Sequence, residues 1–200
     1  MTTKAEIRKI HLNKRNNFSE DYVIAATKEI NRKLIETLKN YINTDSIVAL
    51  YSAINNEINL DDTINDLSNT KTKLALPWIS YNDKIMQFKL WHRDEALSKT
   101  EDFYCPQPES SAKTVTPSII VAPLVTCDIE GNRIGYGKGY YDKYINQHYK
   151  EHPLIIGLCY DKNIHTETIP HEPHDCKLSI LISEEKSLIT DTNDLQRKAF

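Results

Sequence analysis

Residue types that can perform chemistry gather in one short stretch, from Asp128 to Asp142. The chain has five glycines, and four of them fall within nine positions of this stretch, at 131, 135, 137 and 139. Glycine permits positive φ and lets backbone N–H groups approach an anion without hindrance from a Cβ atom. A helix predicted from about Tyr140 to Tyr149 would add an N-terminus, whose unpaired N–H groups favour phosphate. The stretch therefore predicts a phosphate-binding loop.

Charged residues in the same stretch extend this prediction. Lys138 and Arg133 would supply positive charge where a transferring phosphate needs it, and Asp142 is suited to hold Mg²⁺. The pattern G-x-G-x-G differs from the G-x-G-x-x-G fingerprint of dinucleotide-binding folds, and it lacks the G-K-[ST] ending of a P-loop. A glycine-rich hairpin without a ligand therefore stays open as an alternative.

The spacing Asp128-x-x-Gly131-x-Arg133-x-Gly135-x-Gly137-x-Gly139-Tyr140-Tyr141-Asp142 resembles the signature of the 5-formyltetrahydrofolate cyclo-ligase (5,10-methenyltetrahydrofolate synthetase) family. Similar segments extend over most of the chain, among them Lys4-x-x-x-Arg8, Ser52 to Glu57 and Pro170 to Asp175. The resemblance implies a three-layer α/β fold. It also implies a ligase of one-carbon metabolism that uses ATP to close 5-formyltetrahydrofolate into 5,10-methenyltetrahydrofolate, releasing ADP and phosphate.

The resemblance further implies roles for individual residues. Lys138 and Arg133 would be catalytic, neutralising the transferring phosphate, while Asp142 and Asp175 would bind Mg²⁺. On the folate side the implied residues are Ser52, Glu57, which would accept hydrogen bonds from the pterin, and Tyr140, which would stack on it. The implied ATP contacts are Lys4, Arg8, Arg133, Ile134, Gly135, Tyr136, Gly137, Lys138, Gly139, Tyr140 and Tyr141. Tyr136 stands where some family members have arginine, which removes one phosphate contact.

Several of these residues have simpler interpretations. Lys4 and Arg8 alone would indicate a solvated basic helix face, and Tyr140 could be a core tyrosine at the start of a helix. In His171-x-x-His174-Asp175, the interrupting prolines favour a structural loop over a metal site, with Asp175 kept as the one ligand.

Apolar runs predict the elements that must position this loop. Short buried strands are expected at 47–51, 73–77, 119–125, 154–158 and 178–182. Helices are expected at 4–17, from Ser19 with a buried face through Leu38, and after a cap at Asn59. Residues 85–91 predict a half-exposed strand with Met86, Phe88 and Leu90 on one face, and 98–117 a long ordered loop. This alternation predicts one α/β domain over residues 1–200 with a mostly parallel sheet and a ligand site outside the carboxyl ends of its strands.

Composition excludes several classes of protein. A formal charge of −3 gives no general reason to expect nucleic acid or an anionic membrane as a partner. The apolar run 119–125 is too short to cross a bilayer, and the charged first residues predict no secretory signal. Four scattered cysteines fit reduced thiols, so we expect a cytoplasmic protein. Without heptads, a monomer is expected.

Two other functions stay open. One is a non-catalytic folate- or nucleotide-binding module on the same fold, although the presence of Lys138, Asp142 and Asp175 together argues against it. The other is an ATP-dependent transferase that acts on a different N-formyl or carboxylate substrate.

Overall fold

The computed structural model describes residues 2–100 and 103–191. The helices are α1 (Lys4–Asn16), α2 (Glu20–Lys39), α3 (Asp61–Ser68) and α4 (Tyr140–Gln147), with 3-10 turns η1 (Tyr149–Glu151) and η2 (Asp161–Asn163). The strands are β1 (Ile47–Ala49), β2 (Lys73–Ile79), β3 (Met86–Leu90), β4 (Ser98–Thr100), β5 (Phe103–Gln107), β6 (Thr114–Val115), β7 (Ile119–Ala122), β8 (Thr126–Cys127), β9 (Arg133–Ile134), β10 (Leu154–Leu158), β11 (Ile180–Ile182) and β12 (Ser187–Ile189).

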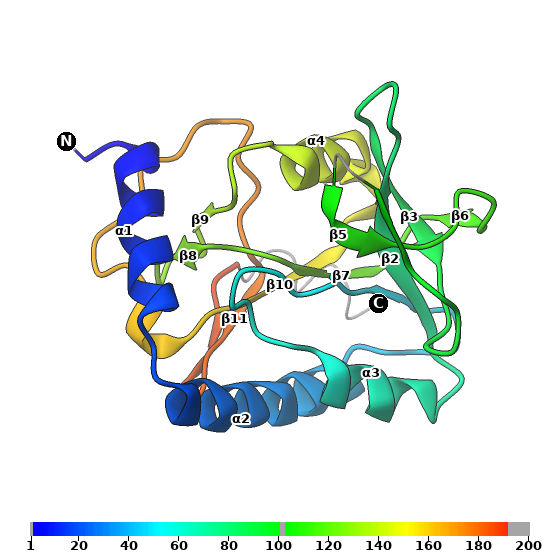
Figure 1. Ribbon diagram of the computed structural model, residues 1–200, viewed down its shortest axis with the longest axis horizontal. Helices are drawn as coiled ribbons and strands as arrows, with labels where there is room; N and C mark the ends of the chain where they lie inside the picture. Colours follow the sequence, from blue (N-terminus) through cyan, green and yellow to red (C-terminus); the bar gives the residue numbers. More distant parts are fainter. Residues whose placement is uncertain (1, 101–102, 192–200) are drawn as a thin grey trace.

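Eight of these strands form a central sheet in the order β12-β11-β10-β7-β1-β2-β3-β6. The five strands from β11 to β2 run parallel, whereas β12, β3 and β6 pair antiparallel at the two sides. Figure 1 shows α2 and α3 on one face of the sheet and α4 on the other. The predicted three-layer α/β fold with a mostly parallel sheet is therefore confirmed.

Two apolar clusters hold the layers together, one on each face of the sheet. Ala26, Ile30, Leu34 and Leu38 recur every four residues along α2, and all four are buried against the strands. Tyr144 and Ile145 of α4 are buried on the opposite face. The parallel strands between them are apolar on both sides, as strands covered on both faces must be.

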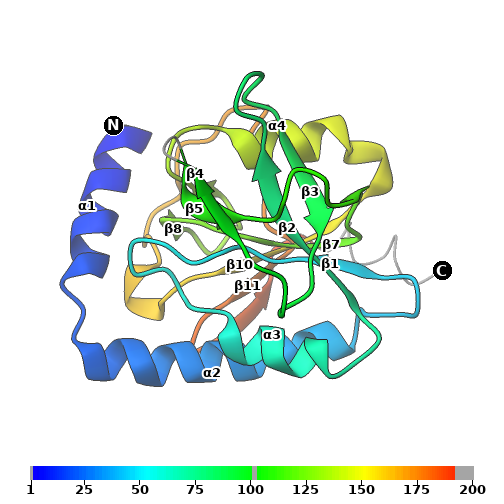
Figure 2. The same cartoon turned by 45° about the vertical axis from the view of Figure 1, so that its right-hand side comes forward.

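The first helix begins with a capping box, in which the Thr3 hydroxyl and the Glu6 carboxylate each bond the other residue's backbone N–H. Figures 1 and 2 both show α1 standing crosswise to α2 at one end of the sheet, and Figure 1 shows β8 and β9 toward the same end. Ile7, His11 and Arg15 are its buried residues. This placement presents the side chains of Lys4 and Arg8 to the same end of the sheet. No helix among the described residues has the length and apolar character to cross a membrane.

Three sequence predictions need correction. The segment 98–117 is not one long loop, because it contains β4, β5 and β6. The strand at 86–90 does not alternate as expected: Lys89 is buried, its ammonium bonding the Ala112 carbonyl, and Leu90 is only half-buried. Leu60, rather than Asn59, is the N-cap of α3, although the Asn59 side chain still accepts from the Asp61 N–H at 2.6 Å.

Candidate active site

A pocket of about 710 Å³ opens at the carboxyl ends of the central strands, where α1, the segment after β1 and the segment before α4 meet. In sheets of this type, ligands bind at that edge. Every residue that the sequence nominated lines this pocket: Lys4, Arg8, Ser52, Glu57, Arg133, Ile134, Gly135, Tyr136, Gly137, Lys138, Gly139, Tyr140, Tyr141, Asp142 and Asp175. Residues from four distant parts of the chain are thus brought together, and their individual roles stay predictions.

The loop from Gly135 to Gly139 joins β9 to α4 and forms one wall of the pocket. Gly137 has φ +89° and Gly139 φ +67°, values that side chains rarely adopt. The Arg8 side chain crosses this loop, donating from Nε to the Gly135 carbonyl at 2.6 Å. A Cβ atom on Gly137 would lie 3.4 Å from the Arg8 guanidinium. Glycine therefore lets the cation of α1 lie directly against the loop.

Gly131 has a different role from the other glycines of the stretch. It lies in the turn between β8 and β9, with φ +84°, and does not line the pocket. A Cβ atom there would lie 2.9 Å from the Leu178 carbonyl oxygen. The two interpretations of the glycine stretch thus apply to different parts of it: its first part is a tight hairpin, and its second part faces the pocket.

Two pairs of a cation and a carboxylate line the pocket. Arg133 donates from Nη2 to Asp142 Oδ1 at 2.7 Å, and the backbone N–H of Cys176 donates to the same oxygen at 3.1 Å. Lys4 forms an ion pair with Asp175. Burial raises the pKa of the Asp175 carboxyl, but hydrogen bonds from Lys4 and from the Glu172 N–H outweigh it, so the pKa lies below its ordinary value.

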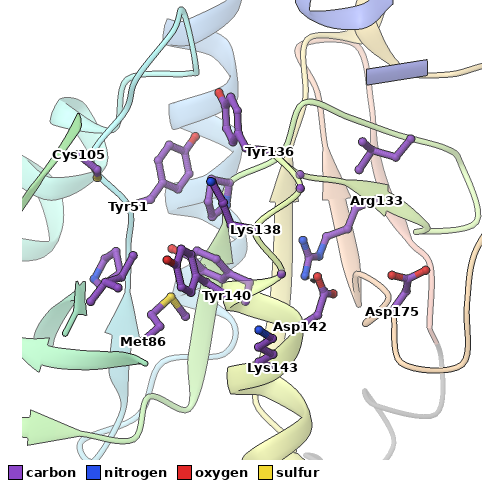
Figure 3. A pocket seen from close by; sticks show the side chains of 18 of the residues that line it. Tyr51, Met86, Cys105, Arg133, Tyr136, Lys138, Tyr140, Asp142, Lys143 and Asp175 are labelled. Atoms are coloured by element: carbon purple, nitrogen blue, oxygen red, sulfur yellow. Dashed lines mark hydrogen bonds and ion pairs between the residues drawn. The ribbon is translucent and has the colours of Figure 1, made fainter. Parts of the chain in front are cut away.

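Lys138 differs from these paired cations. Its side chain is exposed, and no hydrogen bond or ion pair joins it to another described residue. Figure 3 shows it near the middle of the pocket, between Tyr136 and Tyr140, with Arg133 and Asp142 to one side. A cation without a protein partner at this position is available to a phosphate.

At the opposite end of the pocket, Glu57 is 8 % exposed. The preceding turn passes through two residues with positive φ, Asn55 and Asn56, which return the chain so that Glu57 Oε2 accepts from the Ile54 N–H at 3.0 Å. Its other oxygen, Oε1, is buried and has no hydrogen-bond partner among the described residues. Burial raises the pKa of Glu57 to about 7. A buried acceptor without a partner invites a ligand that carries N–H donors.

The remaining nominated folate residues, Ser52 and Tyr140, line the same pocket as Glu57. Ser52 donates its hydroxyl to the Pro106 carbonyl at 3.1 Å, so it joins the segment after β1 to β5. Tyr140 is half-buried at the start of α4 and packs against the apolar cluster on that face. Figure 3 shows Tyr51, Cys105 and Met86 on the same side of the pocket. Tyr51 and Met86 were not nominated from the sequence, because buried apolar side chains give no signal that separates a pocket wall from the core.

His171 and His174 lie in the segment that leads to Asp175 and β11. His174 is exposed and lies 3.3 Å from the Glu172 carboxylate. Within the described residues no three His, Cys, Asp or Glu side chains converge to hold a metal ion. The role of Asp175 as a metal ligand therefore stays a prediction.

Comparisons with known proteins agree with the geometry. Residues 1–184 match the 5-formyltetrahydrofolate cyclo-ligase family. The 5-formyltetrahydrofolate cyclo-ligase of Mycoplasma pneumoniae is 28% identical over 184 residues, covering 91% of this chain and 99% of its own length. The Saccharomyces cerevisiae enzyme of the same name is 26% identical over 191 residues, covering 84% of this chain and 90% of its own length. The structure of 5,10-methenyltetrahydrofolate synthetase from Aquifex aeolicus superimposes with a TM-score of 0.78 at 25% identity. The superposition covers 94% of this chain and 92% of the Aquifex aeolicus chain. The chain belongs to the 5-formyltetrahydrofolate cyclo-ligase family.

Proposed function

We propose that this protein uses ATP to close 5-formyltetrahydrofolate into 5,10-methenyltetrahydrofolate, with release of ADP and phosphate. The observation that carries the proposal is the single pocket that joins a cation-lined glycine loop to a buried carboxylate with a free acceptor oxygen. Phosphate transfer from a triphosphate to a pterin compound needs the phosphate-binding groups and the pterin-binding groups in one cavity. The family membership and the names of the relatives support the same reaction.

The reaction begins when the formyl oxygen attacks the γ-phosphorus of ATP. The bond between that phosphorus and the β–γ bridging oxygen breaks, giving ADP and an N5-iminium phosphate. The N10 amine then adds to the activated carbon and loses its proton, and the phosphate leaves with the C–O bonding pair as the methenyl bridge forms. Phosphorylation is needed because an amide-like oxygen is a poor leaving group.

The protein's part in this chemistry is alignment and charge compensation. We assign Lys138 to the transferring phosphate, since it has no competing partner, and Arg133 to the same charge, since it is held by Asp142 beside the loop. The backbone of Gly135 to Gly139 and the side chains of Lys4 and Arg8 complete the phosphate contacts. Pairing with carboxylates keeps Lys4 and Arg133 oriented before ATP arrives, and the Gly135 carbonyl holds Arg8.

On the folate side we assign Glu57 to the pterin N–H groups, which its free oxygen is placed to accept. Tyr140 supplies an aromatic face for the pterin ring. Ser52 contributes by holding the segment after β1 in place.

Mg²⁺ would be held by Asp142 and Asp175 together with phosphate oxygens. The two carboxylates are brought close because the backbone N–H of Cys176, the neighbour of Asp175, bonds Asp142. Their oxygens suit Mg²⁺, which commonly uses one or two carboxylates plus substrate phosphates. When bound, the ion offsets the negative charge of the phosphates.

The remaining assignments are a single domain over residues 1–200, a monomer and a cytoplasmic location. All four cysteines lie in the described part of the chain and are unpaired, which supports a reducing compartment. Light scattering on the purified chain tests the monomer, and a dimer mass would contradict it.

The decisive experiment measures the absorbance of the methenyl product when the protein meets 5-formyltetrahydrofolate, ATP and Mg²⁺, with ATP omitted as the control. Product that depends on ATP would establish the reaction. Folate binding in a thermal-shift assay without product would indicate a non-catalytic module. Absence of folate binding would mean that the substrate is a different N-formyl or carboxylate compound.

A further inference from the structure

Arg15, in the last turn of α1, is a buried cation that forms no ion pair with any described residue. It is 3% exposed, less than any other charged residue of the helix. Its Nη1 donates to the Leu124 carbonyl at 3.0 Å, and its Nη2 donates to the Tyr136 hydroxyl at 2.5 Å. A buried charge without a counter-ion is costly to keep. Its contacts therefore call for an explanation beyond packing.

Glu57 is the carboxylate that faces this cation. Burial raises the pKa of Glu57, whereas the hydrogen bond from the Ile54 N–H, then the Arg15 charge and the Tyr136 hydroxyl, lower it. Arg15 and Glu57 also line a second, small cavity of about 10 Å³, near the lower limit for a single water molecule. Arg15 Nε and Glu57 Oε1 are both buried atoms without a protein partner.

Tyr136 connects this pair to the glycine loop, because it lies between Gly135 and Gly137. Its ring lies beneath the Arg15 guanidinium, 5.9 Å from ring centre to Cζ. Burial, followed by the charge of Glu57, raises the pKa of Tyr136 to about 12, so the hydroxyl keeps its proton and can donate it. Tyr136 thus accepts from Arg15 on one side and has its proton available for Glu57 on the other.

We propose that Arg15 is a positioning residue for the reaction, which holds the Tyr136 hydroxyl beside Glu57 and so fixes the phosphate loop and the folate-binding carboxylate from one buried side chain. The part of this inference that concerns substrates rests on the proposed function. The contact itself does not, since it is a property of the protein alone. Tyr136 therefore replaces the arginine of some family members with a hydroxyl that an arginine from α1 can hold.

The groups that face Glu57 come from several elements, and any titration of its carboxyl reflects all of them. They are Arg15 of α1, Tyr51 after β1, Cys105 of β5, Tyr136 of the glycine loop and Tyr141 of α4. Of these only Arg15 is positively charged at neutral pH. Removing it, or the hydroxyl that it holds, must shift the Glu57 carboxyl toward its protonated form.

The test is a titration of the Glu57 carboxyl by NMR in the whole protein labelled with ¹³C-glutamate, with the signal assigned from Glu57→Gln. Tyr136→Phe removes only the hydroxyl, Arg15→Met removes the charge at similar volume, and Arg15→Lys restores a charge without the planar fork. Lys14→Met, an exposed neighbour on α1, is the matched control. We expect Tyr136→Phe and Arg15→Met to raise the Glu57 pKa by about one unit. Arg15→Lys should recover part of the shift, and Lys14→Met should leave the titration unchanged.

The same shift should appear in the acid limb of the pH profile of kcat/KM for 5-formyltetrahydrofolate. An unchanged Glu57 titration in Tyr136→Phe and in folded Arg15→Met would overturn the inference; if Arg15→Met does not fold, Tyr136→Phe decides alone. A purely structural role for Arg15 would lower stability without moving the titration. Failure of the wild-type protein to form product would count against the proposed function only, because the NMR titration needs no substrate.

Discussion

The two ends of the pocket differ in how their charged side chains are compensated. At the end assigned to phosphate, Lys4 and Arg133 are paired with Asp175 and Asp142, so the charges compensate one another before a ligand arrives. At the end assigned to folate, Glu57 is buried without an ion pair to any described residue, and its pKa rises to about 7. In the proposed reaction, phosphate oxygens would take the place of the carboxylates at the first end, so each cation would exchange one negative partner for another. The second end carries an unfavourable charge that only a ligand or its buried neighbours can offset.

This contrast ranks the residues by how far each can be replaced. Among several paired cations, the loss of one leaves the others in place. A cation without a protein partner, or a single buried carboxylate, has no substitute. We therefore expect the largest effects from Lys138 and Glu57 and smaller effects from the paired groups.

Lys138→Ala should lower turnover by about 10²–10³-fold, the usual loss when one group that stabilises transition-state charge is removed. The melting temperature should stay close to that of the wild type, because the side chain is exposed and forms no hydrogen bond or ion pair with another described residue. Steady-state kinetics and a thermal melt measure the two effects. Lys150→Ala, an exposed lysine outside the pocket, is the control. Near-normal turnover in Lys138→Ala would remove this residue from the mechanism.

Glu57→Gln should raise KM for 5-formyltetrahydrofolate by about 10–100-fold, since a hydrogen bond to a charged group is worth about 1.5–3 kcal/mol. KM for ATP should change far less, because Glu57 lies at the other end of the pocket. An equal loss for both substrates would contradict the division of the pocket into two ends.

Glu57→Gln should weaken substrate binding but make the folded protein more stable. The pKa of Glu57 is higher in the folded protein, about 7, than the ordinary value of 4.5. The folded state therefore binds a proton more tightly than the unfolded state, and stability falls as pH rises from about 4.5 to 7. Glu57→Gln removes this cost, so it should raise the free energy of unfolding at pH 8 by on the order of 3 kcal/mol. The gain should vanish below pH 4, which denaturant titrations at the two pH values would measure.

Arg8→Gln should raise KM for ATP by about tenfold, the effect of losing one charged hydrogen bond, and turnover should fall less than in Lys138→Ala. Arg8 is held by the Gly135 carbonyl rather than by a carboxylate, and Lys4 and Arg133 remain nearby. Lys9→Gln on the exposed face of α1 is the matched control. If Arg8→Gln and Lys9→Gln had the same small effect, the basic residues of α1 would be a solvated face.

The sequence predicted the elements best where burial is strong and regular. The every-fourth-residue pattern of α2 and the apolar strands β1, β7 and β10 all form where expected, because apolar burial determines both the pattern and the packing. The short strands β4, β5 and β6 were missed, since Pro106 and the polar residues of this segment resemble a loop. β4 and β5 pair with each other, whereas β6 pairs with the more distant β3. Lys89 was misplaced for a similar reason: the carbonyl that satisfies its ammonium lies 23 positions away.

The site shows the same limit more sharply. The nominated residues converge on one pocket, but the glycine stretch alone could not separate Gly131, which is needed for a hairpin turn, from Gly137, which faces the pocket. Arg15 was missed entirely, although its spacing from Arg8 and Lys4 places all three near one face of a helix. What it binds is a tyrosine hydroxyl 121 positions away. Such partners become visible only when the fold brings them together.

Asp142→Asn tests the paired end of the pocket, and its effect should be the smallest. Asparagine keeps an oxygen that can accept from Arg133 and from the Cys176 N–H, so the loop should stay in place. What it loses is a negative charge for Mg²⁺. We expect the Mg²⁺ concentration for half-maximal activity to rise several-fold, while turnover at saturating Mg²⁺ changes little. Asp161→Asn, whose partner Lys186 lies outside the pocket, is the control. An unchanged Mg²⁺ titration would mean that Asp142 serves only to hold Arg133, and the paired end of the pocket would then be an orienting device for cations rather than a metal site.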